Sequence, residues 1–97
     1  MIKCEEITVY STVSQREGNV TSDMAGEKVL FNVDKGKYYN LGSIGGEIWG
    51  ELKDPIRVSN LIDILIEKFE VSRDVCEDEV IRFLTMLDSE ELLNKHN

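Results

Sequence analysis

The sequence predicts a single α+β domain of winged helix-turn-helix type, in which a three-stranded antiparallel sheet is followed by three helices. Residues 6–41 contain strand-like segments, and residues 43–87 space their apolar side chains as helices do. The chain has 97 residues, of which 41% are hydrophobic and 31% charged. Because one core normally serves ~100 to 150 residues, we expect one domain over residues 1–97.

The strand-like segments are residues 6–13, 27–33 and 37–41. The first alternates apolar and polar residues, with Ile7, Val9 and Val13 on one face. The other two are rich in branched and aromatic side chains, and the turn DKGK, with Gly36 at positive φ, joins them as a hairpin. The polar residues 14–26 are expected to be a mobile connection.

The helical segments are residues 43–52, residues 59–69, and a longer segment that begins at Ser72. Ser43 and Ser59 stand where N-caps are favoured, and Pro55 ends the first helix. Residues 56–58 are expected to be a short extended piece. The side chains expected in the core are Ile44, Ile48, Leu52, Val58, Leu61, Ile62, Leu65, Phe69, Val75, Cys76, Val80, Phe83, Leu84, Leu87, Leu92 and Leu93.

The charge balance opposes binding to nucleic acid. The net charge is −8 at pH 7, whereas nucleic-acid binding needs basic patches, so a basic peptide, or a peptide recognised through its backbone, is a more natural partner. No apolar run approaches the ~20 residues of a membrane span. The N-terminal MIKCEEITVY has no apolar block and no small-residue cleavage site. We therefore expect a cytoplasmic protein that binds neither nucleic acid nor membranes.

Residues with catalytic or metal-binding chemistry are few. His96 is the one histidine, at a penultimate position that is expected to fray. Cys4 and Cys76 fit no metal spacing or disulfide framework, and neither has an evident base to activate it. GSIGG matches no phosphate-binding motif, and the acidic clusters CEDE and DSEE lack the pattern of a calcium loop. We expect no catalytic residue, no metal and no cofactor, and hence a protein that is not an enzyme.

Residues 29–65 carry an ordered pattern of motifs. A hairpin ends in aromatic-x-Leu (Tyr39 and Leu41), a glycine (Gly45) stands three residues before an Ile-Trp pair (Ile48 and Trp49), and V-x-x-L (Val58 and Leu61) opens the next helix. The terminal CEDEVIRFLTMLDSEELL is similar to a D-V-x-x-F-L-x-x-L helix, with Asp78 one place out of register. This set resembles the PqqD-like family of RiPP recognition elements, which serve ribosomal peptide natural-product pathways. The doubled tyrosine and the Ile-Trp pair look most like the stand-alone leader-peptide-binding proteins of split lasso-peptide clusters.

The chain departs from the family pattern at a few positions. Gly42 stands where asparagine is frequent, and Gly46 and Gly50 stand where alanine or larger residues are usual. Glu90 and Glu91 replace the glycine that normally precedes the final Leu-Leu.

The resemblance implies a protein that binds the N-terminal leader of a precursor peptide by β-strand addition. The leader would lie antiparallel on the sheet edge beside the third helix and be delivered to a processing enzyme, in the lasso case a leader-cleaving cysteine protease. A PqqD-like peptide chaperone for a radical-SAM maturase is the alternative within the same fold. A winged-helix DNA-binding regulator is the alternative from another class, and the net charge of −8 argues against it.

General physics independently favours strand addition. An exposed sheet edge is a template for another chain, and residues 37–41 have no proline and only one charge, on Lys37. The same open edge predicts a weak homodimer with which a leader would compete. Tyr38 and Tyr39 must point to opposite faces of the sheet.

On the third helix, the positions that flank the core stripe are where a docked strand would touch. The candidate leader-binding residues are Lys37, Tyr38, Tyr39, Asn40, Glu79, Arg82, Phe83 and Met86. Structural roles remain open for several of them: both tyrosines as packing residues, Met86 as an incidental surface residue, and Arg82 as an intrahelical partner of Asp78 or Glu79. Trp49 is assigned mainly to packing, with a protease-facing surface as the alternative.

Overall fold

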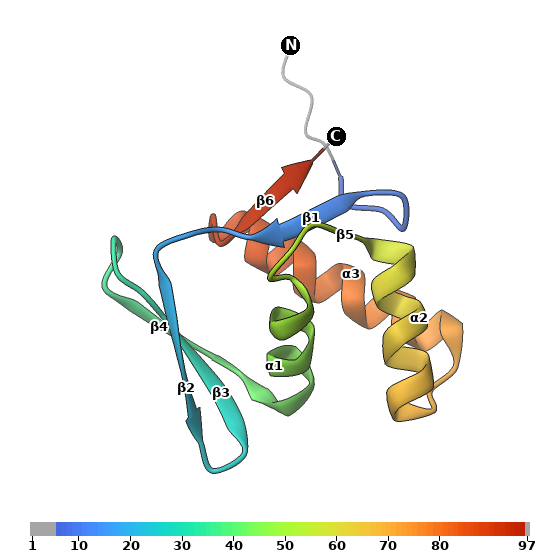
Figure 1. Ribbon diagram of the computed structural model, residues 1–97, viewed down its shortest axis with the longest axis horizontal. Helices are drawn as coiled ribbons and strands as arrows, with labels where there is room; N and C mark the ends of the chain where they lie inside the picture. The colour runs from blue at the N-terminus through green and yellow to red at the C-terminus, as the bar shows by residue number, and fades with distance from the viewer. Residues whose placement is uncertain (1–5, 97) are drawn as a thin grey trace.

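The structure, a computed structural model, describes residues 6–96, and within them the chain forms six strands and three helices (Figure 1). Their order is β1, β2, β3, β4, α1, β5, α2, α3 and β6. The predicted α+β, winged-helix-like class is confirmed, and the strands form two small antiparallel sheets rather than one. Cys4 lies outside the described residues.

One sheet is a hairpin-like wing, here called the wing sheet, with the order β2-β3-β4. Its strands are β2 (Asn19–Met24), β3 (Glu27–Asn32) and β4 (Lys37–Leu41). β3 and β4 lie where the sequence predicts them, and Gly36 in their turn has φ +65°. The prediction of a mobile connection over residues 14–26 is wrong, because β2 pairs with β3 from Asn19 to Met24. Almost every side chain of β2 is exposed, so the strand has no apolar alternation to signal it.

The other sheet, here called the terminal sheet, has the order β5-β1-β6. Its strands are β1 (Thr12–Gln15), β5 (Ile56–Arg57) and β6 (Leu93–His96). The predicted strand over residues 6–13 is largely wrong. Instead, a turn forms in which the Ser11 N–H donates to the Thr8 carbonyl at 3.1 Å and the Thr8 N–H donates to Ser11 Oγ at 3.0 Å. Ile7 is buried nonetheless, so its position in the apolar pattern reflects burial of a loop.

The C-terminal residues belong to the terminal sheet. His96 pairs with Thr12 across β6 and β1, and its Nε2 is hydrogen-bonded to Ser14 Oγ at 2.7 Å. The expectation that this residue frays is therefore wrong, because backbone pairing and the buried Leu92 and Leu93 hold the segment in place.

The helices are α1 (Gly42–Glu51), α2 (Val58–Phe69) and α3 (Arg73–Ser89). Their N-cap residues are Leu41, Arg57 and Ser72, none with a side-chain capping bond, so the predicted Ser43 and Ser59 caps are wrong. Gly42 stands at the start of α1. Its φ of +74° lies in the left-handed region that glycine adopts freely and asparagine tolerates, which explains the departure from the family pattern there. No helix in the described part of the chain is long and apolar enough to cross a membrane.

The core lies between the three helices and the inner faces of the two sheets (Figure 1). Most of the apolar side chains predicted to lie in the core are buried. Trp49, at 4% exposure, is a packing residue as expected. Two predicted core residues are wrong: Ile44 is 48% exposed and Val75 is 56% exposed. Both lie in the first turn or two of their helices, where the protein does not cover them.

Two glycines of α1 allow close packing on opposite sides. A Cβ at Gly45 would lie 2.8 Å from Phe83 Cε1, and a Cβ at Gly46 would lie 2.7 Å from Lys28 Cβ on β3. Gly46 is thus explained by the approach of α1 to the wing sheet. A Cβ at Gly50 would meet nothing within 4 Å, and the structure gives no reason for glycine there.

Candidate functional site

β4 is an edge strand of the wing sheet, and one of its sides has no strand partner among residues 6–96. Alternate residues of such a strand direct their N–H and C=O groups outward, where another strand can pair with them. β2 is the other edge, but its side chains are nearly all exposed and none of them belongs to the hydrophobic core. β4, by contrast, is joined to the end of α3 by side-chain hydrogen bonds.

Side chains alternate along β4 as the sequence predicts. Tyr39 is partly buried and packs against the core, whereas Tyr38 is 72% exposed. On the outer face the Tyr38 ring lies 4.6 Å from its cross-strand neighbour Phe31, centroid to centroid, at an interplanar angle of 40°. Asn40 shares this face and donates to Glu27 Oε1 at 3.0 Å. The candidate residues of β4 therefore divide between the two faces of the sheet.

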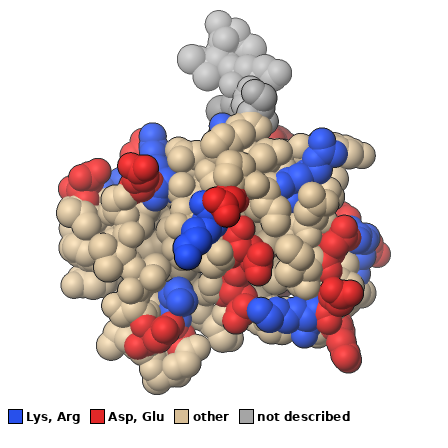
Figure 2. All heavy atoms as spheres, in the orientation of Figure 1, with Lys and Arg blue, Asp and Glu red and all other residues tan. Residues whose placement is uncertain are grey.

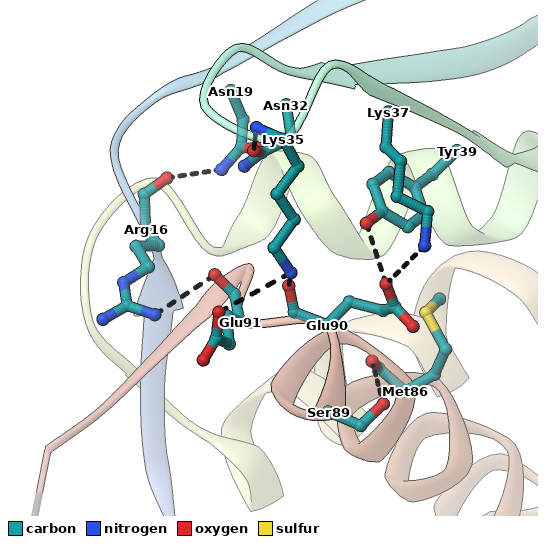
Figure 3. Close-up of polar contacts among 10 residues, drawn as sticks. All are labelled: Arg16, Asn19, Asn32, Lys35, Lys37, Tyr39, Met86, Ser89, Glu90 and Glu91. Carbon is teal, nitrogen blue, oxygen red and sulfur yellow. Dashed lines mark hydrogen bonds and ion pairs between the residues drawn. The ribbon is translucent and has the colours of Figure 1, made fainter.

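The inner face of β4 is tied to the C-terminal end of α3 by three residues, here called the Glu90 latch (Figure 3). The Tyr39 hydroxyl donates to Glu90 Oε1 at 2.8 Å, and Lys37 Nζ donates to the same oxygen at 3.2 Å. Lys35 Nζ donates to the Glu90 backbone carbonyl, which adds a second link from the β3–β4 turn.

The latch shifts the acidity of each member. The hydrogen bond from Tyr39, followed by that from Lys37, holds the pKa of Glu90 below its usual value. Partial burial, followed by the hydrogen bond to Glu90, raises the pKa of Tyr39. The hydrogen bond to Glu90 also raises the pKa of Lys37. At neutral pH the latch is an anionic acceptor held by one neutral and one cationic donor.

The candidate residues of α3 lie at different distances from β4. Phe83 packs beside Gly45, against the start of α1. Met86 is 36% exposed, and its side chain extends on the β4 side of α3, next to the Glu90 carboxylate (Figure 3). Arg82 makes an intrahelical ion pair with Asp78 at 3.3 Å, which favours the structural role left open for it. Glu79 is exposed, near the N-terminal half of the helix.

The structure thus brings Lys37, Tyr39 and Met86 together at the end of α3, but it places Tyr38 and Asn40 on the opposite sheet face. Glu90 was missed by the sequence reasoning. The only signal for it was the departure from the family glycine before Leu92. The structure shows that Glu91, not Glu90, takes the left-handed conformation there, with φ +63°.

A separate apolar pocket, here called the helical pocket, lies between α1, α2 and α3. Its volume is about 290 Å³, and its walls include Ile44, Val71, Val75 and Phe69. Glu79 is the single charged side chain that lines it in the described part of the chain. Glu79 therefore belongs to this pocket as well as to the candidate set.

Among residues 6–96, the titratable groups offer no sign of an activated nucleophile. Cys76 is buried, and burial raises the pKa of its thiol, which disfavours the reactive thiolate. No cluster of three or more His, Cys, Asp or Glu side chains in residues 6–96 has the geometry to hold a metal ion. Basic and acidic side chains are interspersed on the face seen in Figure 2, with no broad basic patch there.

Comparison with known proteins identifies the family to which the chain belongs. The family described as "Coenzyme PQQ synthesis protein D (PqqD)" matches residues 27–93, from the start of β3 to the start of β6. The chain therefore belongs to the PqqD family, as the resemblance in its sequence indicated.

Among solved structures, the chain is similar to that described as "TbiB1 in Complex with the TbiA(beta) Leader Peptide". The two share 27% sequence identity with a TM-score of 0.74, over 84% of this chain and 94% of the other. No curated protein gives a significant match.

Proposed function

We propose that this protein binds the leader segment of a ribosomally made precursor peptide as an added strand on β4 and presents it to a processing enzyme. The observation that carries the proposal is the edge strand β4, which has no second strand partner within residues 6–96 and whose inner face is fastened to the end of α3. Membership of the PqqD family and similarity to TbiB1, which was solved with a leader peptide, support it.

β4 is the better of the two edges of the wing sheet. A peptide on β4 would contact α3 with its inward side chains, beside Met86 and the Glu90 latch. A peptide on β2 would meet mostly exposed side chains of that strand. Specific peptide binding needs side-chain pockets as well as backbone pairing, and β4 has a neighbouring helix to supply them.

The energetics suit a moderately tight complex. Each backbone hydrogen bond contributes ~1 kcal/mol net, and burial of one or two large apolar side chains contributes roughly 2–3 kcal/mol each. Ordering a disordered leader costs several kcal/mol. The balance is compatible with a dissociation constant of about 1 μM or lower.

The protein acts in this proposal as a binding partner and not as a catalyst. The partner enzyme is a leader-cleaving cysteine protease of a lasso-peptide pathway, the assignment favoured by the doubled tyrosine and the Ile-Trp pair. A radical-SAM maturase is the second candidate partner, favoured by the family description, which names coenzyme PQQ synthesis. Co-purification of the protein with each enzyme, with and without leader peptide, distinguishes the two.

A winged-helix regulator that binds DNA is disfavoured by the net charge of −8 and by the interspersed charges seen in Figure 2. A gel shift with duplex DNA at low salt is expected to show no complex.

A weak homodimer through paired β4 edges remains part of the proposal, and solution scattering should show a mass that falls toward the monomer when leader is added.

The test uses labelled leader segments of any precursor peptides encoded near this gene, titrated with protein and followed by fluorescence anisotropy. Saturable binding is expected, with slower amide hydrogen exchange on β4 and unchanged exchange on β2. The absence of saturable binding to the wild-type protein overturns the proposal.

A matched pair of methionines locates the site. Met86 beside β4 and Met24 on β2 are both exposed, at 36% and 60%. Met86→Glu is expected to weaken leader binding about tenfold, roughly the loss of one apolar contact, and Met24→Glu to leave it unchanged. The reverse pattern would assign the leader to β2.

A further inference from the structure

The Glu90 carboxylate places a negative charge from the end of α3 beside the inner face of β4. Glu90 is the C-cap residue of α3, and the bonds from Tyr39 at 2.8 Å and Lys37 at 3.2 Å both end on its Oε1. The other oxygen, Oε2, lies on the side of Met86 (Figure 3). The Glu90 side chain is 32% exposed, so an incoming chain can contact it.

The side-chain donors on the inner face of β4 are both directed at this one carboxylate. Lys37 Nζ lies 5.4 Å from the centroid of the Tyr39 ring, so the amine and the hydroxyl converge on the same acceptor. Lys35 donates to the Glu90 backbone carbonyl, at the helix end where the dipole is negative. A pair of donors that could hold a carboxylate of a ligand is thus occupied by a carboxylate of the protein itself.

A strand added to β4 brings its own side chains to this place. Residues directly opposite each other in an antiparallel pair have Cβ atoms about 4.5–5.5 Å apart on the same face of the sheet. The leader residues opposite Lys37, Tyr39 and Leu41 therefore face inward, at every second position of the leader. The leader residue opposite Lys37, here called the facing residue, lies beside the Lys37 amine and within reach of Glu90.

The charge of the facing residue decides whether it fits. An acidic side chain there would need the Lys37 and Tyr39 donors, which it obtains only by displacing Glu90. Glu90 competes from within the same chain, at a high effective concentration, and two carboxylates on one pair of donors repel each other. A neutral donor such as glutamine displaces nothing, because neither bond of the latch uses Oε2.

We infer that Glu90 is a specificity-determining residue, which keeps acidic side chains out of the leader position opposite Lys37 and accepts a neutral donor there. This inference rests on the proposed function. It makes Glu90 an internal occupant of a carboxylate site formed by Lys37 and Tyr39. Removal of its charge should therefore open that site to an acidic leader residue.

The experiment compares labelled leader peptides that carry glutamate or glutamine at each position in turn. For wild-type protein, one inward-facing position is expected to bind the glutamine peptide about 5- to 10-fold more tightly, the cost of a like-charge contact. In Glu90→Gln the glutamate peptide is expected to bind at least as tightly as the glutamine peptide at that position. The net charge of −8 acts on all positions of the leader, so comparison among them removes its general effect.

Glu91→Gln is the matched control, since it removes the same charge one residue away. The Glu91 side chain is 69% exposed and pairs with Lys35 at 3.7 Å, outside the Glu90 latch. This variant should keep the wild-type preference for glutamine at the facing residue. Loss of the preference in Glu91→Gln as large as in Glu90→Gln would assign it to the general field of the helix end and overturn the inference.

Salt provides a test on the unaltered protein. The ratio of the two affinities at the facing residue is expected to shrink as ionic strength rises, because salt screens the repulsion. A wild type that binds leader with no preference for glutamine at any inward-facing position, or with a preference that salt does not change, overturns the inference, as does a Glu90→Gln variant with the wild-type preference. Each of these results leaves the proposed function standing. Failure of the wild type to bind any leader overturns the proposed function, and the inference with it.

Discussion

The hydroxyl of Tyr39 donates a 2.8 Å hydrogen bond to the carboxylate of Glu90, two residues that lie 51 positions apart in the chain. The bond joins the proposed docking strand to the C-cap residue of α3 and helps to fix the spacing between the strand and the helix at that end. Lys37 shares the same acceptor oxygen and reinforces the bond.

Replacing Tyr39 by phenylalanine removes the largest cause of the low pKa of Glu90. The pKa of Glu90 is therefore expected to rise toward its usual value in Tyr39→Phe, as measured by NMR titration of the side-chain carboxyl carbon. Tyr38→Phe is the matched control, since the Tyr38 ring lies on the opposite face against Phe31, and it should leave the Glu90 titration unchanged. A Glu90 titration that does not move in Tyr39→Phe contradicts the latch.

The low pKa of Glu90 gives stability a defined pH dependence. The folded protein holds this proton less tightly than the unfolded chain, whose glutamates titrate near ~4.3, so the unfolded state binds more protons as the pH falls. The contribution of Glu90 is fully present above about pH 4.3 and is lost as the pH drops through its lower folded pKa. Urea unfolding at several pH values should show a shallower acid loss in Glu90→Gln than in the wild type. Glu67→Gln, an exposed change on α2, should keep the wild-type slope.

Two glycines four residues apart in α1 are expected to respond oppositely to alanine. In Gly46→Ala the new methyl group would lie 2.7 Å from Lys28 Cβ, so α1 must move away from β3, and the free energy of unfolding should fall by about 1–3 kcal/mol. In Gly50→Ala the methyl group meets open space, and the helix gains about 0.5–1 kcal/mol from restricted backbone freedom. Chemical denaturation measures both. Destabilisation by Gly50→Ala would show that the glycine has a role that the packing does not reveal.

The left-handed conformation of Glu91 should make glycine the better residue at this turn. Its φ is +63°, which is unfavourable for a residue with a Cβ, although glycine also loses more backbone entropy on folding. Glu91→Gly is expected to be more stable than Glu91→Ala by about 0.5–1 kcal/mol. The comparison between the two variants removes the contribution of the Lys35–Glu91 ion pair, which both lack. Equal stability of the two would mean that the turn adopts another conformation in solution.

Much of the fold could be predicted because its strongest patterns are local. The β3–β4 hairpin and the apolar core-facing side chains of α2 follow from composition and spacing, and they occupy the predicted residues. β2 and β6 could not be predicted in the same way. Their stability comes from pairing with β3 and β1, and neither presents an apolar alternation that a single sequence reveals.

The candidate site was predictable on the strand and less so on the helix. Strand alternation correctly separated Tyr38 from Tyr39. The Glu90 latch depends on where α3 ends and on which way its last turn faces, and both are set by the turn at Glu91. Exposure of Ile44 and Val75 depends on how far neighbouring helices extend over them, which residue spacing alone does not encode.

The burial of Trp49 provides an optical signal of folding that needs no label. It is the single tryptophan of the chain, it is 4% exposed, and it sits on α1 with its backbone carbonyl accepting a 2.7 Å hydrogen bond from the Gln15 side chain. Its emission should shift to longer wavelength when the core opens to water. Since Trp49 is buried and does not line the helical pocket, intrinsic fluorescence can report the stability of every variant described above while a labelled peptide reports binding at a separate wavelength.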